Sequence, residues 1–195
     1  KGRDTMGASL QREVDKGRMT ADAMQGALER LELVEPERGV GPLRDCGLVI
    51  EAVIEQLDVK QATFRALEEV VASDCVLATN TSSLSIASIA AGCKHPERVL
   101  GVHFFNPATV LPLVEIIAGV RTDAVVAERV ARLVDGWGKV TVRAADTPGF
   151  IVNRIARPFY GEALRMLEEG VADVATIDWA MKAIGGFRMG PFELM

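Results

Sequence analysis

Hydrophobic and polar positions along this chain follow two alternating patterns, one typical of buried strands and one typical of helices. Mostly apolar runs, many of them rich in branched residues, predict strands over residues 47–53, 75–80, 98–105, 113–119 and 139–145. Apolar residues at helical spacing predict the intervening helices over residues 59–72, 83–92 and 122–138. This alternation indicates a largely parallel sheet, in which the last strands run either parallel or antiparallel.

Local signals mark the ends of several elements. Thr20, Asp58 and Thr122 have side chains suited to cap the helices that follow them. Ahead of the first buried strand, residues 5–17 predict a weak helix and residues 31–36 a short strand.

The pattern becomes wholly helical after the sequence DTPGF at residues 146–150. Residues 149–170 and 174–186 predict two helices with no strand between them. We therefore expect two domains. Residues 1–147 form a Rossmann-like, doubly wound α/β domain, and residues 148–195 begin an all-helical domain.

The composition narrows the class of protein. The chain of 195 residues is 49% hydrophobic but only 5% aromatic, so its core must be aliphatic. Its net charge of -5 argues against a nucleic-acid partner. No apolar run approaches the ~18 residues that cross a bilayer, so we expect no membrane partner.

The three cysteines lack C-x-x-C spacing, which indicates a reducing compartment without disulfides or a metal site. We expect that compartment to be the cytoplasm. Because the first residue is lysine rather than methionine, the sequence leaves open whether a targeting segment precedes it.

Polar residues gather where the predicted strands end. Glu51 and Glu55 follow the first strand, Ser82 follows the second, His103 ends the third, and Glu115 lies within the fourth. Ligands of doubly wound sheets bind at the carboxyl ends of the strands. These clusters therefore predict a single site at that edge of the sheet.

Each of these residues also has a purely structural interpretation. Ser82 or Ser83 could cap the helix that follows, and a lone histidine such as His103 is more often a satisfied core residue. The remaining polar candidates could simply be residues that face solvent, and these are Glu115, Asn153 and Lys60.

Together the residue types suit the oxidation of a secondary alcohol. A base that titrates near neutral pH must take the hydroxyl proton, which favours His103. A carboxylate such as Glu115 can orient the imidazole and stabilise its charged form. Hydroxyl or amide groups such as Ser82 and Asn153 can hold the substrate oxygen.

From about residue 10 onward, the chain resembles the L-3-hydroxyacyl-CoA dehydrogenase family. The segments that carry the resemblance occur in family order: LVIEAVIEQLDVK, TNTSSLSI, GVHFFNPATVLPLVEI, DTPGFIVNR and MGPFEL. The resemblance implies NAD-dependent oxidation of the 3-hydroxyl of an L-3-hydroxyacyl-CoA to a 3-ketoacyl-CoA, as in fatty acid β-oxidation. The segment VNRIARPFYGEALRMLEEG resembles members that act in phenylacetate or 3-hydroxybutyryl-CoA metabolism.

The resemblance also implies roles for individual residues. His103 matches the catalytic base and Glu115 its carboxylate partner, while Ser82 and Asn153 match groups that hold the substrate oxygen. The positions that match the lining of the NAD site are Ala52, Glu55, Lys60, Ser82 and Asn106.

The sequence departs from the family at both ends. Family members begin with a strand, a G-x-G-x-x-G loop, a helix and a second strand, and this sequence lacks that first β-α-β unit. In the family, the helical domain closes the acyl-CoA site and forms a homodimer. Only the first helices of that domain are present here. We expect residues 1–195 alone to bind NADH weakly and to be inactive.

Two other functions fit parts of the pattern. Ser82, His103 and Glu115 supply the residue types of a serine hydrolase, although the serine lacks the G-x-S-x-G context of a nucleophile elbow. A non-catalytic protein that binds a dinucleotide or CoA would also retain the fold. An NADH absorbance assay with acetoacetyl-CoA discriminates among the three.

Overall fold

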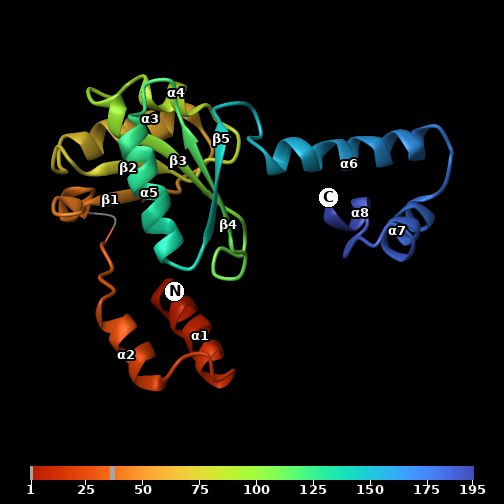
Figure 1. The fold of residues 1–195 in the computed structure, drawn as a ribbon, viewed down its shortest axis with the longest axis horizontal. Coiled ribbons are helices and arrows are strands. Elements are labelled where there is room, and N and C mark those ends of the chain that lie inside the picture. The colour runs from red at the N-terminus through yellow and green to blue at the C-terminus, as the bar shows by residue number, and fades with distance from the viewer. Residues whose placement is uncertain (1, 36–37) are drawn as a thin grey trace. The chain divides into compact units, whose positions relative to one another are not determined.

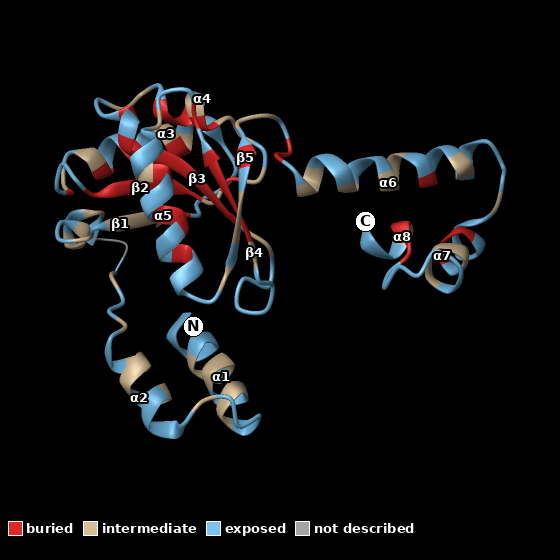
Figure 2. Cartoon of the chain, in the orientation of Figure 1, coloured by how far each residue is buried: buried red, intermediate tan, exposed pale blue. Residues whose placement is uncertain are grey.

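The computed structural model describes residues 2–35 and 38–195, and the chain divides into two compact units, residues 1–42 and 43–195 (Figure 1). The first unit contains helices α1 (Gly2–Asp15) and α2 (Ala21–Glu29), which contact each other. Thr20 caps α2 as predicted, because its side chain accepts a hydrogen bond from the Ala23 N–H. Neither helix has a buried residue (Figure 2).

The short strand predicted over residues 31–36 is wrong for residues 31–35, which adopt no regular structure, and residue 36 lies outside the described residues. The alternating apolar pattern there has no neighbouring strand with which to form a ladder, and an unpaired strand is not stable by itself. A 3-10 helix, η2 (Gly41–Leu43), follows.

The second unit begins with an α/β region in which strands and helices alternate as the sequence predicts. The elements are β1 (Leu48–Glu51), α3 (Leu57–Glu68), β2 (Val76–Thr79), α4 (Ile86–Ala90), η3 (Pro96–Arg98), β3 (Val99–Phe104), β4 (Leu113–Ala118), α5 (Ala124–Gly136) and β5 (Val140–Ala145). The strands form one sheet in the order β1-β2-β3-β4-β5. All neighbours are parallel except β3 and β4, which are antiparallel.

Helices cover both faces of this sheet (Figure 1). On one face, alternate residues of the central strands, such as Leu100 and Ile116, pack against α5 in a core that includes Val130 and Val134. On the other face Ile86 of α4 packs against Gly101, where an added Cβ would come within 2.8 Å of Ile86 Cδ1. The buried residues accordingly concentrate in the sheet (Figure 2). The predicted doubly wound, Rossmann-like α/β class is confirmed.

Two predicted helix caps are wrong by one or two residues. α3 begins at Leu57 after Gln56, so Asp58 lies in the first turn and does not cap the helix. α5 is capped by Asp123, whose side chain accepts from the Val125 N–H. Thr122 instead links the end of β4 to the start of β3. Its hydroxyl accepts from the Gly119 N–H, just after β4, and donates to the carbonyl of Val99, the first residue of β3.

The helices that follow the sheet are α6 (Val152–Glu168), α7 (Val174–Ala183) and α8 (Pro191–Leu194). The carboxylate of Asp178 in α7 accepts from the N–H groups of Phe192 and Glu193, which open α8. Gly190 allows this approach, because a Cβ there would lie 2.3 Å from the Asp178 carboxyl. Over the described residues, none of the helices has the length and apolar character needed to cross a membrane.

Candidate active site

The antiparallel pairing of β3 and β4 places His103 directly opposite Glu115. Residues opposite each other in a ladder project from the same face, and here His103 Nδ1 lies 2.7 Å from Glu115 Oε2. Glu115 is fully buried and His103 is only 5% exposed. Because a carboxylate can only accept hydrogen bonds, this contact favours the neutral tautomer with the proton on Nδ1 and the lone pair on Nε2, which is the form that a general base needs.

The position of Glu115 within its strand differs from the sequence expectation. Glu115 lies near the amino end of β4 rather than at a carboxyl end. Since β4 runs antiparallel to β3, that amino end adjoins the carboxyl end of β3, where His103 lies. The reversal of one strand therefore brings the two residues together.

The second oxygen of Glu115 contacts the start of α6. Glu115 Oε1 accepts hydrogen bonds of 3.0 Å from the backbone N–H groups of both Ile151 and Val152. The first N–H groups of a helix have no partner within the helix, and its N-terminus favours negative charge. One buried carboxylate therefore holds the histidine on one side and the helical segment on the other.

Aromatic rings enclose the imidazole. The ring of Phe105 lies 4.6 Å from that of His103, and the ring of Phe150 lies 5.7 Å away in an edge arrangement. Phe150 has a φ of 48°, which is uncommon for a bulky residue and carries strain of about 1–3 kcal/mol. The turn before α6 is thus held so that an apolar ring covers the histidine.

Asn153 and Ser82 also meet at the start of α6. The side-chain amide of Asn153 donates a 3.4 Å hydrogen bond to the backbone carbonyl of Ser82. Asn153 follows Val152, one of the residues bound by Glu115, so both polar pairs converge on the same helical turn.

The interpretation of Ser82 or Ser83 as a helix cap is wrong. The cap of α4 is Ser85, whose hydroxyl accepts from the Ser88 N–H. The hydroxyls of Ser82 and Ser83 instead lie 3.4 and 3.2 Å from the Glu55 carboxylate. The loop after β2 is therefore organised by a carboxylate from the loop after β1.

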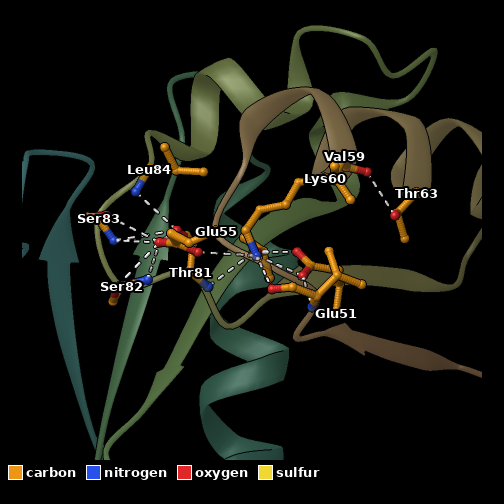
Figure 3. A network of polar contacts seen from close by, with 11 residues as sticks. Glu51, Glu55, Val59, Lys60, Thr63, Thr81, Ser82, Ser83 and Leu84 are labelled. Carbon is orange, nitrogen blue, oxygen red and sulfur yellow. Dashed lines mark hydrogen bonds and ion pairs between the residues drawn. The ribbon is translucent and has the colours of Figure 1, made fainter.

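Glu55 is the centre of this polar network (Figure 3). Its Oε1 accepts from the Thr81 hydroxyl at 2.5 Å and from the N–H groups of Ser82 and Ser83 at 3.0 and 3.2 Å. Burial raises the pKa of Glu55, but the hydrogen bonds from Thr81 and Ser82 and the charge of Lys60 outweigh it and lower the pKa to about 2. The carboxylate is therefore ionised at neutral pH.

Lys60 is buried, at 1% exposure, although a lysine at a helix start is ordinarily solvated. Its ammonium lies 2.7 Å from Glu51 Oε1 and 3.3 Å from Glu55 Oε2 (Figure 3). It also lies 3.3 Å from the Val53 carbonyl. An ammonium has three N–H donors, so these three acceptors occupy all of them. Lys60 therefore connects two carboxylates below the loop that carries Ser82.

Ala52 and Asn106 lie at the same edge of the sheet. Ala52 directly follows β1 and Asn106 lies two residues beyond β3, and both are exposed. The structure thus groups His103 with Glu115, Ser82 with Asn153 and Glu55 with Lys60, and places Ala52 and Asn106 beyond the carboxyl ends of β1 and β3, on either side of β2.

Sequence reasoning missed several residues that shape the site. Thr79 is buried and donates a 2.8 Å hydrogen bond to Glu51, one of the polar residues predicted at the strand ends, and the Asn80 side chain accepts from the Phe104 N–H. Asp146 accepts from the N–H groups of Ile86 and Ala87, which fastens the DTPGF turn to α4. Their positions at strand ends were the available signal, but no local pattern separates them from solvated residues.

A metal site, a reactive cysteine and a Ser–His–Glu hydrolase site have little support in the structure. In the part of the chain that the structure describes, no three His, Cys, Asp or Glu side chains form a group that could hold a metal ion. The cysteines are free, and burial raises the pKa of Cys93 to about 11, which makes its thiol unreactive. The hydroxyl of Ser82 faces Glu55, whereas the hydrogen-bond partner of His103 is Glu115.

Two family models match this chain. The model of the 3-hydroxyacyl-CoA dehydrogenase NAD binding domain matches residues 1–147, and the model of the C-terminal domain of the same enzymes matches residues 149–195.

Individual proteins are similar along almost the whole chain. A 3-hydroxyadipyl-CoA dehydrogenase from Escherichia coli K12 is 49% identical over 98% of this chain, and a 3-hydroxybutyryl-CoA dehydrogenase from Bradyrhizobium diazoefficiens is 40% identical over 99%. The chain spans only 40% and 65% of the lengths of these relatives.

Solved structures agree with this similarity. The crystal structure of Mycobacterium tuberculosis FadB2 has a TM-score of 0.92 at 42% identity, over 99% of this chain and 67% of that chain. The crystal structure of 3-hydroxybutyryl-CoA dehydrogenase from Escherichia coli K12 has a TM-score of 0.93 at 49% identity, over 98% of this chain and 40% of that chain.

Proposed function

We propose that this chain, which belongs to the 3-hydroxyacyl-CoA dehydrogenase family, carries part of the catalytic site of an NAD-dependent oxidoreductase. The reaction is oxidation of the 3-hydroxyl of an L-3-hydroxyacyl-CoA to a 3-ketoacyl-CoA. The observation that carries this proposal is the buried His103–Glu115 pair, which is the histidine and carboxylate that alcohol oxidation requires.

In the proposed reaction His103 acts as the general base. Nε2 takes the proton of the 3-hydroxyl, and the buried carboxylate of Glu115 stabilises the imidazolium that results. The rings of Phe105 and Phe150 limit the access of water to this proton. The Glu115 bonds to the start of α6 keep the carboxylate fixed while the charge on the imidazole changes.

Ser82 and Asn153 hold the substrate oxygen in this proposal. The bond between the Asn153 amide and the Ser82 carbonyl keeps the two residues adjacent. A hydroxyl and an amide can both donate to an oxygen as it becomes a carbonyl, which stabilises the transition state.

The residues at the sheet edge fit an NAD cofactor. The loops after β1 and β2 present the Ser82 and Ser83 hydroxyls, the Glu55 carboxylate and exposed Ala52, whose side chain ends at Cβ and leaves room for a ring. When bound, NAD accepts the hydride that leaves the alcohol carbon. In this arrangement Lys60 acts through Glu55, because its own donors are occupied within the protein.

Two further expectations belong to this proposal. We expect a homodimer formed through the helical segment, which is supported by the exposed side chains of Ile155 and Phe187 and the half-buried ring of Phe159 around a hollow of about 480 Å³. We also expect a cytoplasmic location, which the free cysteines support. Sedimentation velocity of the protein that carries this sequence tests the dimer.

The activity is tested by NADH oxidation with acetoacetyl-CoA in the intact protein that carries this sequence. We expect His103→Gln to reduce turnover by about 10²–10⁴-fold, the usual cost of losing a general base, with little change in NADH binding. Ser82→Ala should also lower turnover. Release of free thiol without NADH oxidation would instead identify a hydrolase, and the absence of both reactions a binding protein.

A further inference from the structure

We propose that Lys139 is a positioning residue for the NAD cofactor, because it holds the loop between β3 and β4 that carries Asn106. The inference rests on the proposed function and adds a residue that no sequence motif singled out. It begins from two hydrogen bonds, in which the Lys139 ammonium donates to the backbone carbonyls of Ala108 and Leu111 at 2.5 and 3.0 Å. These carbonyls lie two and five positions after Asn106.

The loop has few other contacts that could hold it in place. Residues 106–111 are all exposed, and the N–H groups of Val110 and Leu111 donate only within the loop, to the Pro107 carbonyl. Over the described residues, the hydrogen bonds that tie residues 106–111 to another part of the chain are those from Lys139. The conformation of the loop therefore depends on this one side chain.

The backbone around Lys139 is itself firmly held at the start of β5. On its C-terminal side, the Val140 N–H donates to the Pro112 carbonyl at 2.9 Å, which joins β5 to the end of the loop. The next N–H, of Thr141, donates to the carboxylate of Asp135 in α5 at 2.9 Å. A flexible binding loop is thus fastened to a rigid scaffold, which is the usual arrangement for residues that bind a ligand.

The ammonium has no competing partner. In the part of the chain that the structure describes, Lys139 forms no ion pair, whereas Lys94 of the same α/β region contacts the Glu69 carboxylate at 2.5 Å. An ammonium has three N–H donors, so Lys139 can hold two carbonyls at once. Because those carbonyls are three residues apart, the contact fixes the loop as a unit.

The expected consequence concerns affinity for the cofactor. Asn106 can contact NADH only in molecules whose loop has the held conformation, and the apparent Kd rises as the fraction of such molecules falls. If loss of the lysine reduces that fraction to between about a third and a tenth, the Kd rises about 3- to 10-fold. Saturating NADH restores the held conformation, so turnover at saturation should change little.

The test measures NADH binding and turnover in the intact protein that carries this sequence. Lys139→Met removes the donors but keeps most of the side-chain length, so the Kd for NADH by fluorescence titration should rise about 3- to 10-fold. With acetoacetyl-CoA and saturating NADH, kcat should stay within about twofold. Lys139→Arg should recover most of the affinity, because a guanidinium can also donate to two carbonyls. Lys94→Met is the matched control and should leave both quantities unchanged.

A double-mutant cycle shows whether Lys139 acts through Asn106. Asn106→Ala should weaken NADH binding, and adding Lys139→Met to that variant should weaken it by less than about a further twofold. Lys139→Met should also keep Tm within about 2 °C of the unmodified protein, since the contact lies at the surface. This combination distinguishes a positioning residue from one that supports the fold.

The outcomes separate this inference from the proposed function. An unchanged Kd for NADH in Lys139→Met would overturn the inference and leave the dehydrogenase activity intact. Full additivity with Asn106→Ala would also overturn it, and so would a large fall in Tm, since Lys139 would then act elsewhere or support the fold. Absence of NADH oxidation by the unmodified protein would refute the proposed function itself.

Discussion

The buried pair of Lys60 and Glu51 should be far more sensitive to substitution than its position at a helix start suggests. Both side chains are 1% exposed, and the ammonium and carboxylate lie 2.7 Å apart. Lys60→Met would leave the Glu51 carboxylate buried without its cation. Breaking such a pair from one side typically costs about 3–5 kcal/mol of unfolding free energy. At about 2–4 °C of Tm per kcal/mol, Tm should fall by roughly 6–20 °C.

Removing both charges should cost less than removing one. In the double variant Glu51→Gln with Lys60→Met, the only carboxylate left without its cation is Glu55, which is 37% exposed to water, so most of the loss should be recovered. The glutamine oxygen can still accept from the Val53 N–H, and its NH2 group can donate to the Thr79 hydroxyl in place of the second carboxylate oxygen. Recovery of stability without recovery of turnover would indicate that the pair also positions Glu55 and the Ser82 loop.

The exposed pair Lys94–Glu69 provides a matched control, with a similar separation of 2.5 Å but side chains that are 70% and 64% exposed. Water and salt screen such a pair, so Lys94→Met should change stability little. Urea denaturation followed by circular dichroism measures all four proteins. Equal losses for Lys60→Met and Lys94→Met would refute the reasoning, because burial would then have no effect on the cost.

Three further predictions follow from the site and the helical segment. Glu115→Gln keeps the acceptor for α6 but removes the charge beside His103, so turnover should fall about 10²–10⁴-fold with a folded protein by circular dichroism; unfolding would indicate a structural carboxylate instead. Folding lowers the pKa of Glu55 from its ordinary 4.5 to about 2, so its stabilising contribution is present above about pH 4.5 and is lost as the pH falls toward 2. Acid titrations should therefore show the stability gap between wild type and Glu55→Gln closing over that range, and a constant gap would contradict this. Gly190→Ala should destabilise by about 1–3 kcal/mol in urea, because its Cβ meets the Asp178 carboxyl, whereas Gly161→Ala, with open space around it, should not.

Local sequence patterns were sufficient for the architecture. Residues 75–78 form an unbroken apolar run at the start of the predicted strand 75–80, which favours a buried strand, and β2 is buried throughout. The regular apolar spacing around Val130 and Val134 likewise predicted α5, because a helix needs one continuous apolar face. Helix caps were less certain, since several neighbouring residues can accept the same N–H bonds. Asp123 and Ser85 cap α5 and α4 in place of the residues expected.

The sequence by itself determined the elements, the largely parallel sheet and the residue types available at its edge, because each depends on hydrophobic spacing or on neighbours along the chain. Only the tertiary structure decided which of those residues meet. The reversal of β4 places Glu115 opposite His103, the start of α6 supplies the second partner of Glu115, and packing beneath the β2 loop buries Lys60 between two carboxylates. These contacts join residues that lie between 5 and 37 positions apart. Most of them depend on which strands pair, on the direction in which they pair and on how helices dock, and the hydrophobic spacing within a single element specifies none of these.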